Sequence, residues 1–474
     1  MHNRKGYKKR WMILLTTVLL TFMSVLDSSI VNVALPVMAK KLNVSMAAIG
    51  WVVTSYLIVI VGMILVFGRL GDLKGKSNVF KAGIIVFTLG SLFCGLTNSL
   101  AVLVIARVIQ AVGAAATMAT NQGIITHVFP ANERGRALGI NGTFVALGAM
   151  VGPPLGGFIV SAFSWEYIFL INIPVGVIAF ILALNTLPKV SEVISEPFDV
   201  KGAVLFGVSI VSLFGALVQG QEIGYNNTYI ILGFIMSVIT FILFLLWEKR
   251  IPSPLLHMEI FDNRLFSLSV LCAFISFLAI GASNIILPFY LQDVMKFSPS
   301  LTGVLMMISP LVLAVAAPMS GHMSDKIGSE VLTFIGLSVT SFGLILMGTL
   351  NQYSAVMHFV VFISIMTLGN GLFQSPNNSL VMSTVAKHKL GIAGSINGLV
   401  RNLGMVCGVA FSTTLLYNRM SSRIGYHVTG YVNGREDIFI YGMRWVYISA
   451  GLLCVLGAAL TFYRLRKLKS ERKG

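Results

Sequence analysis

Residues 68–75 read Gly68-Arg-Leu-Gly-Asp72-Leu-Lys-Gly75, and residues 321–328 read Gly321-His-Met-Ser-Asp325-Lys-Ile-Gly328. In both stretches two glycines enclose an aspartate, and the spacing is the same. Each stretch follows one long apolar run and precedes another, so each is predicted to be a tight loop between two membrane-spanning helices. The chain therefore contains the same helix–loop–helix unit twice.

Further segments repeat in the same order. Residues 32–36, Asn-Val-Ala-Leu-Pro, return as residues 284–288, Asn-Ile-Ile-Leu-Pro, and residues 140–142, Ile-Asn-Gly, return as residues 396–398. The offset between the copies stays between 252 and 256 residues. Several matches in order at a nearly constant offset predict that the chain consists of two duplicated halves.

Composition places both halves in a membrane. Of the 474 residues, 56% are hydrophobic and only 11% are charged, whereas about 25% of a soluble domain is charged. So little charge could not cover the surface of a soluble protein. We predict membrane-spanning helices over residues 11–35, 47–68, 79–97, 100–122, 137–161, 165–187, 201–219, 228–247, 266–290, 300–320, 331–349, 353–375, 393–417 and 443–463.

The predicted fold is an all-α membrane protein with fourteen transmembrane helices, in which two six-helix pseudo-repeat bundles are separated by two further helices. We expect residues 1–187 to form the N-terminal bundle and residues 266–474 to form the C-terminal bundle with a basic tail. Residues 188–265 would be a linker that contains the two extra helices. Two similar bundles suggest alternating access around a cavity near the middle of the membrane.

The distribution of Lys and Arg predicts the orientation. Most of the 34 basic residues fall in the two termini and in the connections on the same side of the membrane. Because loops rich in Lys and Arg stay in the cytoplasm, we expect a multi-pass protein of the cell membrane with both termini cytoplasmic. The opposite side, with residues 418–442 as its one long loop, holds only Lys40, Lys41, Lys296, Arg419, Arg423, Arg435 and Arg444, and two arginines, Arg107 and Arg401, remain inside helices.

Two charged residues distinguish the first half from the second. Asp27 lies well inside the first predicted helix, and its counterpart in the second half is Ala279. Arg107 lies in the fourth helix, and its counterpart is Ile363. A carboxylate in the middle of a membrane helix costs about 2.5–3.5 kcal/mol, so Asp27 needs a partner, a proton or water.

Depth along the helices suggests that these two residues meet. At a rise of 1.5 Å per residue, Asp27 lies about 25 Å above Arg10, and Arg107 lies about 10 Å below the outer end of its helix at Leu100. In a hydrocarbon core of about 30 Å, both lie in the outer half. Beside Arg107 the carboxylate of Asp27 would stay ionised, and away from it the group would take up a proton. The alternative is a static ion pair with a structural role.

These residues belong to motifs that resemble those of the major facilitator superfamily, in particular its fourteen-helix drug/proton antiporter family. The loop at 68–75 is similar to the superfamily's signature loop, although Leu73 stands where a basic residue is usual. Helix 1 carries Leu26-Asp27-Ser-Ser-Ile-Val-Asn32-Val-Ala-Leu-Pro36, and helix 4 carries Arg107-Val-Ile-Gln110. Helix 5 carries Gly148-Ala-Met-Val-Gly152-Pro153-Pro154-Leu-Gly156-Gly157, which looks like the antiporter motif.

The resemblance implies roles for these motifs. Asp27 and Arg107 would couple transport to protons, and Gly68, Asp72 and Gly75, with Asp325 as a weaker echo, would form a latch for the outward-facing state. Gly148, Gly152, Pro153, Gly156 and Gly157 would bend helix 5, allow close helix packing and prevent leak. The polar residues that we expect to line a substrate cavity are Asn32, Gln110, Asn121, Asn377 and Arg401.

The expected function is proton-coupled efflux, by antiport, of lipophilic or amphiphilic compounds. We expect these compounds to be neutral, monovalent cationic or anionic, because no second membrane-embedded acid is evident in the C-terminal half. Three alternatives remain: an exporter of an endogenous metabolite or lipid, a proton-independent facilitator, and a membrane sensor. We expect a monomer whose partners are small lipophilic substrates, protons and membrane lipids.

Other function classes are disfavoured. The net charge of +17 is spread over short loops rather than over a binding face, so no nucleic-acid partner is expected. The four cysteines lie in apolar runs without metal-ligand spacing, and no Walker A pattern occurs. We therefore expect no enzyme activity, no metal and no cofactor, with the proton as the coupling ion.

Overall fold

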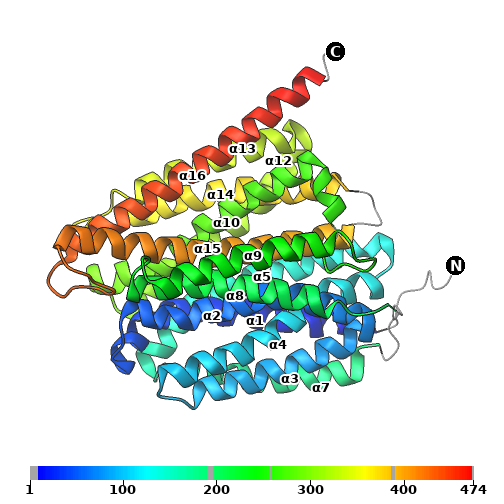
Figure 1. Cartoon of the computed structure of the whole chain (residues 1–474), viewed down its shortest axis with the longest axis horizontal. Helices are drawn as coiled ribbons and strands as arrows, with labels where there is room; N and C mark the ends of the chain where they lie inside the picture. Colours follow the sequence, from blue (N-terminus) through cyan, green and yellow to red (C-terminus); the bar gives the residue numbers. More distant parts are fainter. Residues whose placement is uncertain (1–8, 189–195, 257, 386–389, 472–474) are drawn as a thin grey trace. The chain divides into compact units, whose positions relative to one another are not determined.

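The structure, a computed structural model, describes residues 9–188, 196–256, 258–385 and 390–471, which form helices and no strand (Figure 1). The basic N-terminal residues Arg4, Lys5 and Lys8 lie outside the described residues. The helices are α1 (Arg10–Leu42), α2 (Met46–Lys74), α3 (Lys76–Gly95), α4 (Leu100–Val128), α5 (Ala131–Ala162), α6 (Tyr167–Leu170), α7 (Asn172–Thr186), α8 (Val200–Ile223), α9 (Thr228–Glu248), the short η1 (Met258–Asp262), α10 (Arg264–Phe289), the π-helical η2 (Tyr290–Val294), α11 (Pro299–Met306), α12 (Ile308–Ile327), α13 (Ser329–Met347), α14 (Val356–Ser383), α15 (Leu390–Ile424) and α16 (Glu436–Glu471).

Fourteen segments of the described chain are long and apolar enough to cross a membrane, as the sequence predicts. Some spans consist of two helical pieces. A short interruption at Ile171 separates α6 from α7, and one at Met307 separates α11 from α12. The chain thus has the predicted all-α architecture of fourteen transmembrane helices.

The chain divides into two compact units, which are described separately. Unit 1 contains Met1–Val44, Ile49–Ala216 and Ile231–Leu256, and unit 2 contains Ser45–Ala48, Leu217–Ile230 and His257–Gly474. The two extra helices, α8 and α9, therefore contribute most of their length to unit 1.

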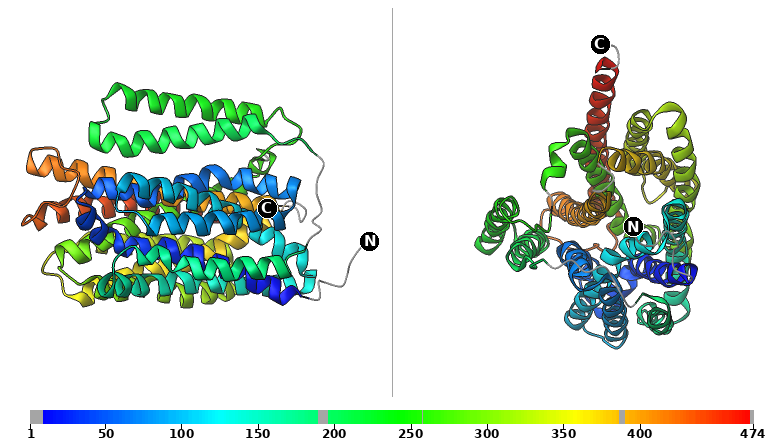
Figure 2. Two further views of the ribbon diagram at one scale, coloured as in Figure 1. Left: turned by 90° about the horizontal axis from the view of Figure 1, so that it is seen from below. Right: turned by 90° about the vertical axis from the view of Figure 1, so that its right-hand side faces the viewer.

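Within unit 1, α8 and α9 pack against each other as a pair (Figure 2). The Ser209 hydroxyl donates to the carbonyl of Ser237 at 3.1 Å. The rings of Phe206 and Phe244 lie 5.1 Å apart between centroids. The opposite side of α9 exposes large apolar side chains such as Leu232 and Ile239, as expected for a surface that contacts lipid.

The duplication is visible in the helix packing of each unit. In unit 1, α4 approaches α3 so closely that a Cβ at Gly113 would lie 2.6 Å from the carbonyl oxygen of Gly83. In unit 2, α14 approaches α13 in the same way, and a Cβ at Gly369 would lie 2.7 Å from the carbonyl oxygen of Gly336. Close packing of membrane helices requires residues without large side chains at the contact. The repeated glycines thus allow the same close packing of two helices in each unit.

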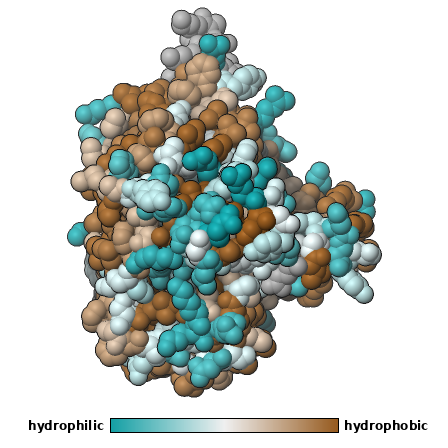
Figure 3. Space-filling model, turned by 90° about the vertical axis from the view of Figure 1, so that its left-hand side faces the viewer, coloured by the Kyte–Doolittle hydropathy of each residue, from teal (hydrophilic) through white to brown (hydrophobic). Residues whose placement is uncertain are grey.

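The ends of the last two spans differ from the sequence-based expectation. Helix α15 continues to Ile424 and α16 begins at Glu436, so the expected loop over 418–442 was wrong, and the connection covers only 425–435. Helices can extend past the apolar core because water and polar groups satisfy their ends. Arg419 lies over the ring of Trp445 at 4.5 Å, and Arg423 lies over the ring of Tyr441 at 5.5 Å. Viewed along the helix axes, hydrophilic side chains gather over the helix ends, and hydrophobic ones cover much of the sides (Figure 3).

Arg464, which the sequence assigns to the basic tail, is instead a buried residue inside a membrane span. Arg464 belongs to the span Glu436–Arg466 and is 3% exposed. Its guanidinium donates to the hydroxyls of Ser269 at 2.8 Å and Thr333 at 3.0 Å. The expected helix ended at 463, where the apolar run ends. The observed helix continues because the guanidinium of Arg464 is bound by neighbouring hydroxyl groups.

Candidate functional site

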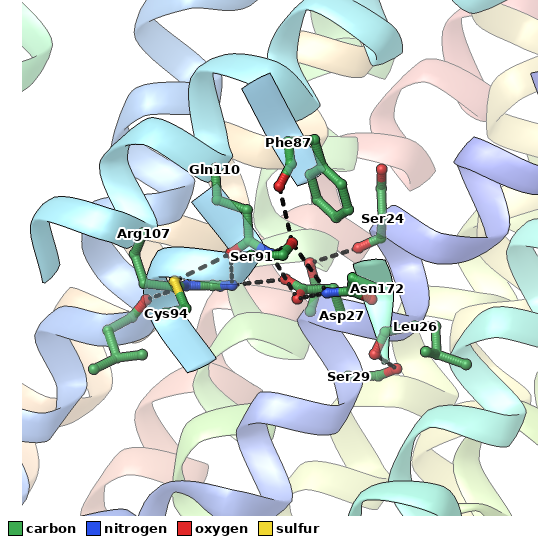
Figure 4. Close-up of polar contacts among 12 residues, drawn as sticks. Ser24, Leu26, Asp27, Ser29, Phe87, Ser91, Cys94, Arg107, Gln110 and Asn172 are labelled. Carbon is green, nitrogen blue, oxygen red and sulfur yellow. Dashed lines mark hydrogen bonds and ion pairs between the residues drawn. The ribbon is translucent and has the colours of Figure 1, made fainter. Parts of the chain in front are cut away.

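A buried ion pair connects α1 and α4 within unit 1 (Figure 4). Asp27 of α1 is fully buried, and Arg107 of α4 is 1% exposed. Arg107 Nη1 donates to Asp27 Oδ2 at 2.6 Å. The structure thus brings together the two charged residues that the sequence places at similar depth in one half only.

Two amide side chains complete the contacts of the Asp27 carboxylate. Gln110 Nε2 donates to Asp27 Oδ1 at 2.9 Å, and Asn172 Nδ2 donates to the same oxygen at 2.7 Å. Both amides also reach the hydroxyl of Ser91 on α3, at 2.8 and 3.4 Å. The carboxylate therefore accepts from α4 at Oδ2 and from α4 and α7 at Oδ1, so both of its oxygens have donors.

The guanidinium of Arg107 is held on several sides. Arg107 Nη1 also donates to Gln110 Oε1 at 2.6 Å, and Arg107 Nε donates to the carbonyl of Val52 on α2 at 3.1 Å. The ring of Tyr56 lies 4.0 Å from the guanidinium carbon, and that of Phe169 lies 5.5 Å from it. Aromatic faces stabilise a cation that has been withdrawn from water.

The second half of the chain has apolar side chains at the matching positions. The residues offset by 252 to 256 from Asp27, Arg107 and Gln110 are Ala279, Ile363 and Met366. All three of these counterparts are buried in unit 2. A buried ion pair rarely increases stability over a well-packed apolar group. The ion pair is thus confined to one half of the duplicated scaffold.

The glycine motif of α5 packs α5 directly against the helix that carries Asp27. A Cβ at Gly148 would lie 2.8 Å from the carbonyl oxygen of Phe22, and one at Gly152 would overlap the hydroxyl of Ser29. That hydroxyl donates to the carbonyl of Gly148 at 3.3 Å. In unit 2, Gly404 approaches α10 in the same way.

The remaining motif residues on α5 lie in the same stretch of helix. Pro153 and Pro154 lie inside α5, Gly156 approaches the backbone of Ile30, and Gly157 is buried. The backbone of α1 around Asp27 is thus fixed by contact with α5 along more than two turns.

The expected loop over 68–75 was wrong, because α2 continues to Lys74 and only Gly75 separates it from α3; Gly328 likewise separates α12 from α13. An ion pair connects the two helix ends in unit 1. Lys76 Nζ lies 2.6 Å from Asp72 Oδ1, and both side chains are about one-third exposed. Gly75 adopts a positive φ of 91°, a conformation that side chains other than glycine rarely allow, and Gly328 in the second copy has the same value. Gly68 lies in α2, where a Cβ would meet no neighbour within 4 Å. Asp325 belongs to α12, but its side chain lies outside the described part of the chain.

Of the five expected cavity residues, three are buried in networks within their own unit. Gln110 belongs to the Asp27 network, Asn121 donates to Thr21 at 2.6 Å, and Asn377 donates to the carbonyl of Ser269 at 3.1 Å. The other two reach the surface of their own unit. Asn32 is half-buried on α1, and Arg401 is exposed on α15, where its guanidinium lies 5.7 Å from the ring of Phe277.

Sequence reasoning missed three contributors to the network: Ser91, Asn172 and Tyr56. Their polar groups lie in apolar runs, and nothing in the sequence shows that their helix faces point toward Asp27. It also missed Asp293, which lies in the last turn of the span Arg264–Val294 and is 7% exposed. The sequence analysis ended that helix at 290, but a π-helical turn carries it further.

Comparison with known proteins agrees with this architecture. A profile of the Major Facilitator Superfamily matches residues 17–409. The riboflavin transporter RibZ of Clostridioides difficile is 35% identical over 466 residues, which cover 97% of this chain and 98% of RibZ. The multidrug resistance protein Stp of Mycobacterium tuberculosis is 30% identical over 416 residues, which cover 88% of this chain and 77% of Stp. The crystal structure of a bacterial homologue of the lysosomal transporter Spinster shares the fold, with a TM-score of 0.68 and 17% identity over 97% of this chain and 98% of that one.

Proposed function

The chain belongs to the Major Facilitator Superfamily and is a membrane transporter, and from that premise we propose that it exports lipophilic or amphiphilic compounds in exchange for protons. The observation that carries this proposal is the fully buried Asp27, whose carboxylate is bound by Arg107, Gln110 and Asn172. A membrane-embedded acid that is present in one half of a duplicated transporter is suited to carry the coupling proton.

In the proposed cycle, the contacts of Asp27 decide whether it holds a proton. In one state of the cycle, Arg107 Nη1 lies 2.6 Å from Asp27 Oδ2, and we propose that this contact excludes the proton. A shift of α4 relative to α1 would remove Arg107 and Gln110 from the carboxylate and leave it with the hydrogen bond from Asn172 but without a neighbouring cation. The carboxylate would then take up a proton from the outer side, and the return of Arg107 would release that proton toward the inner side.

The other motifs support this cycle mechanically. The contact between α5 and α1 at Gly148 and Gly152 would keep the proton path closed in one state. The loop ion pair of Asp72 and Lys76 would act as a latch for the outward-facing state. Asn32 and Arg401 are the expected cavity residues that reach the surface of their units, and we propose that they contact the cargo.

We further propose that the protein works as a monomer in the cell membrane, with both termini in the cytoplasm. The bias of Lys and Arg toward one set of connections supports this orientation. Protons, small lipophilic substrates and membrane lipids would be its partners.

A second candidate function is transport of an endogenous aromatic metabolite. The similarity to the riboflavin transporter RibZ extends over nearly the full length of both chains. Arg401 beside the ring of Phe277 would suit a flat or anionic ligand. The two candidate functions differ in cargo rather than in mechanism.

A transport assay with the purified protein in liposomes tests the proposal. The cargo would be a lipophilic monovalent cationic dye or riboflavin, with and without an imposed pH gradient. We expect the dye to be transported only while the gradient is present. Transport that continues after an ionophore collapses the gradient would favour a proton-independent facilitator, and transport of riboflavin but not of the dye would favour the second candidate.

A further inference from the structure

A pair of buried acids lies where the two extra helices meet, away from the residues of the Asp27 network. Asp199 precedes α8 and caps it, because Asp199 Oδ1 accepts the backbone N–H of Gly202 at 2.9 Å. Glu248 is the last residue of α9, and its Oε2 accepts the backbone N–H of Leu256 at 2.9 Å. Trp247 Nε1 also donates to Asp199 Oδ1 at 2.9 Å. All of these groups belong to unit 1.

Each acid thus has one satisfied oxygen and one oxygen without a donor. Asp199 Oδ2 and Glu248 Oε1 are buried and have no hydrogen-bond partner. The residues are 4% and 3% exposed. Both oxygens face the same point, because a Cβ at Gly202 would overlap Asp199 Oδ2 and lie 2.7 Å from Glu248 Oε1. Two buried acceptors that face each other without a donor are unfavourable unless a proton lies between them.

No cation in the described part of the chain replaces that proton. Lys201 Nζ lies 4.0 Å over the ring of Trp247 rather than beside a carboxylate. Lys249 and Arg250, which follow Glu248, are exposed, and Glu196 on the other side of the cap pairs with Arg69 of α2. Within the described residues, no group of three or more His, Cys, Asp or Glu could hold a metal ion.

The helix termini indicate which acid carries the proton. Asp199 lies at the N-terminus of α8, where the partial positive charge of the helix favours a carboxylate. Glu248 lies at the C-terminus of α9, where the partial negative charge disfavours one. Glu248 is therefore expected to be the donor of the shared proton and Asp199 its acceptor.

We propose that Asp199 and Glu248 form a second proton-binding site, in which Glu248 Oε1 donates a single shared proton to Asp199 Oδ2. The pair connects the start of α8, the end of α9 and the segment that leads to Leu256. The Asp199–Glu248 pair, termed the clasp, connects the two helices of the insert, α8 and α9, at one end.

The clasp weakens when the proton leaves. The folded protein holds a proton that the unfolded chain releases at neutral pH, so this contribution to stability is lost as the pH rises. In the variant Glu248→Gln, the amide N–H₂ replaces the donor at every pH. The variant Asp262→Asn serves as a control, because Asp262 is an exposed acid of the short helix that follows.

Infrared difference spectroscopy of the purified full-length protein tests the site directly. At neutral pH we expect the C=O stretching band of a protonated carboxylic acid, which is lost in Glu248→Gln and Asp199→Asn and retained in Asp262→Asn. A band that is absent from the wild type, or that is unchanged in both clasp variants, would overturn the proposal.

Thermal unfolding gives a second measurement that does not depend on the spectra. We expect the melting temperature of the wild type to fall between mildly acidic and neutral pH, where the unfolded chain releases the proton that the folded pair keeps, and that of Glu248→Gln to fall less. If Mg²⁺ or Ca²⁺ raised the melting temperature of the wild type but not of Glu248→Gln, the pair would be a cation site, and the shared proton would be refuted.

Discussion

The Asp27–Arg107 pair is surrounded by groups that match its charges. Arg107 uses its guanidinium for Asp27, Gln110 and the carbonyl of Val52, and Asp27 accepts hydrogen bonds at both oxygens. Such a network is stable only while all of its members are present, because each loss leaves a buried polar group without a partner. The site can therefore be tested by variants that remove one charge or both.

Removal of one charge of the pair should lower the free energy of unfolding more than removal of both charges. We expect Arg107→Ala to lower the free energy of unfolding by about 3–5 kcal/mol, because it leaves the buried Asp27 carboxylate uncompensated. The double variant Asp27→Asn/Arg107→Gln should lose much less than the sum of the single variants. Denaturant titration in detergent micelles measures these differences. Losses that add without any coupling would contradict the network.

Loss of a neutral donor should change the pH dependence of export instead. Asn172→Ala removes one hydrogen bond to the charged form of Asp27, so the proton is taken up more easily. We expect the pH at which export is half-maximal to rise. Asn141→Ala serves as the control, since Asn141 is buried but bonds to Thr21 and Asn121. An equal shift in both variants would argue against a specific role for Asn172.

At the scale of helices, the contact of α5 with α1 fixes the position of the Asp27 backbone. Gly152 meets the side chain of Ser29, and in the second half Gly408 meets the backbone carbonyl of Leu278. A side chain can move aside more easily than a backbone, so the two contacts should differ in their tolerance of a methyl group.

This difference gives a prediction for α5. Gly152→Ala should lower stability by about 1–3 kcal/mol because its methyl group overlaps Ser29, and Ser29→Ala should restore part of the loss. Gly142→Ala in the same helix is the matched control, because a Cβ there meets nothing within 4 Å. Thermal unfolding of Gly152→Ala, of the double variant Gly152→Ala/Ser29→Ala and of Gly142→Ala provides the measurement. A loss in Gly142→Ala as large as that in Gly152→Ala would show that the contact has no specific effect.

The helices were predictable from sequence because membrane thickness fixes their minimum length. Their ends were less predictable, as α16 shows by continuing to Glu471 through the buried Arg464. Within the site, Asp27 and Arg107 were identifiable since charges inside apolar runs are costly. Ser91 and Asn172 were not, because their contribution depends on how α3 and α7 are rotated about their axes.

At the scale of the whole molecule, duplication and asymmetry have separate roles. The two halves share glycine contacts, such as those of Gly148 and Gly404 with the carbonyl groups of Phe22 and Phe274, both at 2.8 Å. They differ in the ion pair, which is replaced by Ala279 and Ile363 in the second half. The shared contacts build the scaffold, and the ion pair gives one half a property that the other lacks.

The proposed orientation can be tested with single cysteines. A membrane-impermeant thiol reagent applied to intact cells should label Asn433→Cys, in the connection between α15 and α16. It should label Lys249→Cys, after α9, only when the cells have been opened. Three of the native cysteines, Cys94, Cys272 and Cys454, are buried, so the background should be low. The reverse labelling pattern would place the termini on the outside.

The central claim is that Asp27 carries the coupling proton. Inside-out membrane vesicles with an acidic interior report this directly, through a pH-sensitive dye that follows the gradient while lipophilic cations or riboflavin are added. Wild type would be compared with Asp27→Asn, and with Asp262→Asn as a control for loss of an acidic residue. We expect substrate to discharge the gradient in the wild type and the control but not in Asp27→Asn. Equal discharge by Asp27→Asn would contradict the account and make the Asp27–Arg107 pair a structural ion pair.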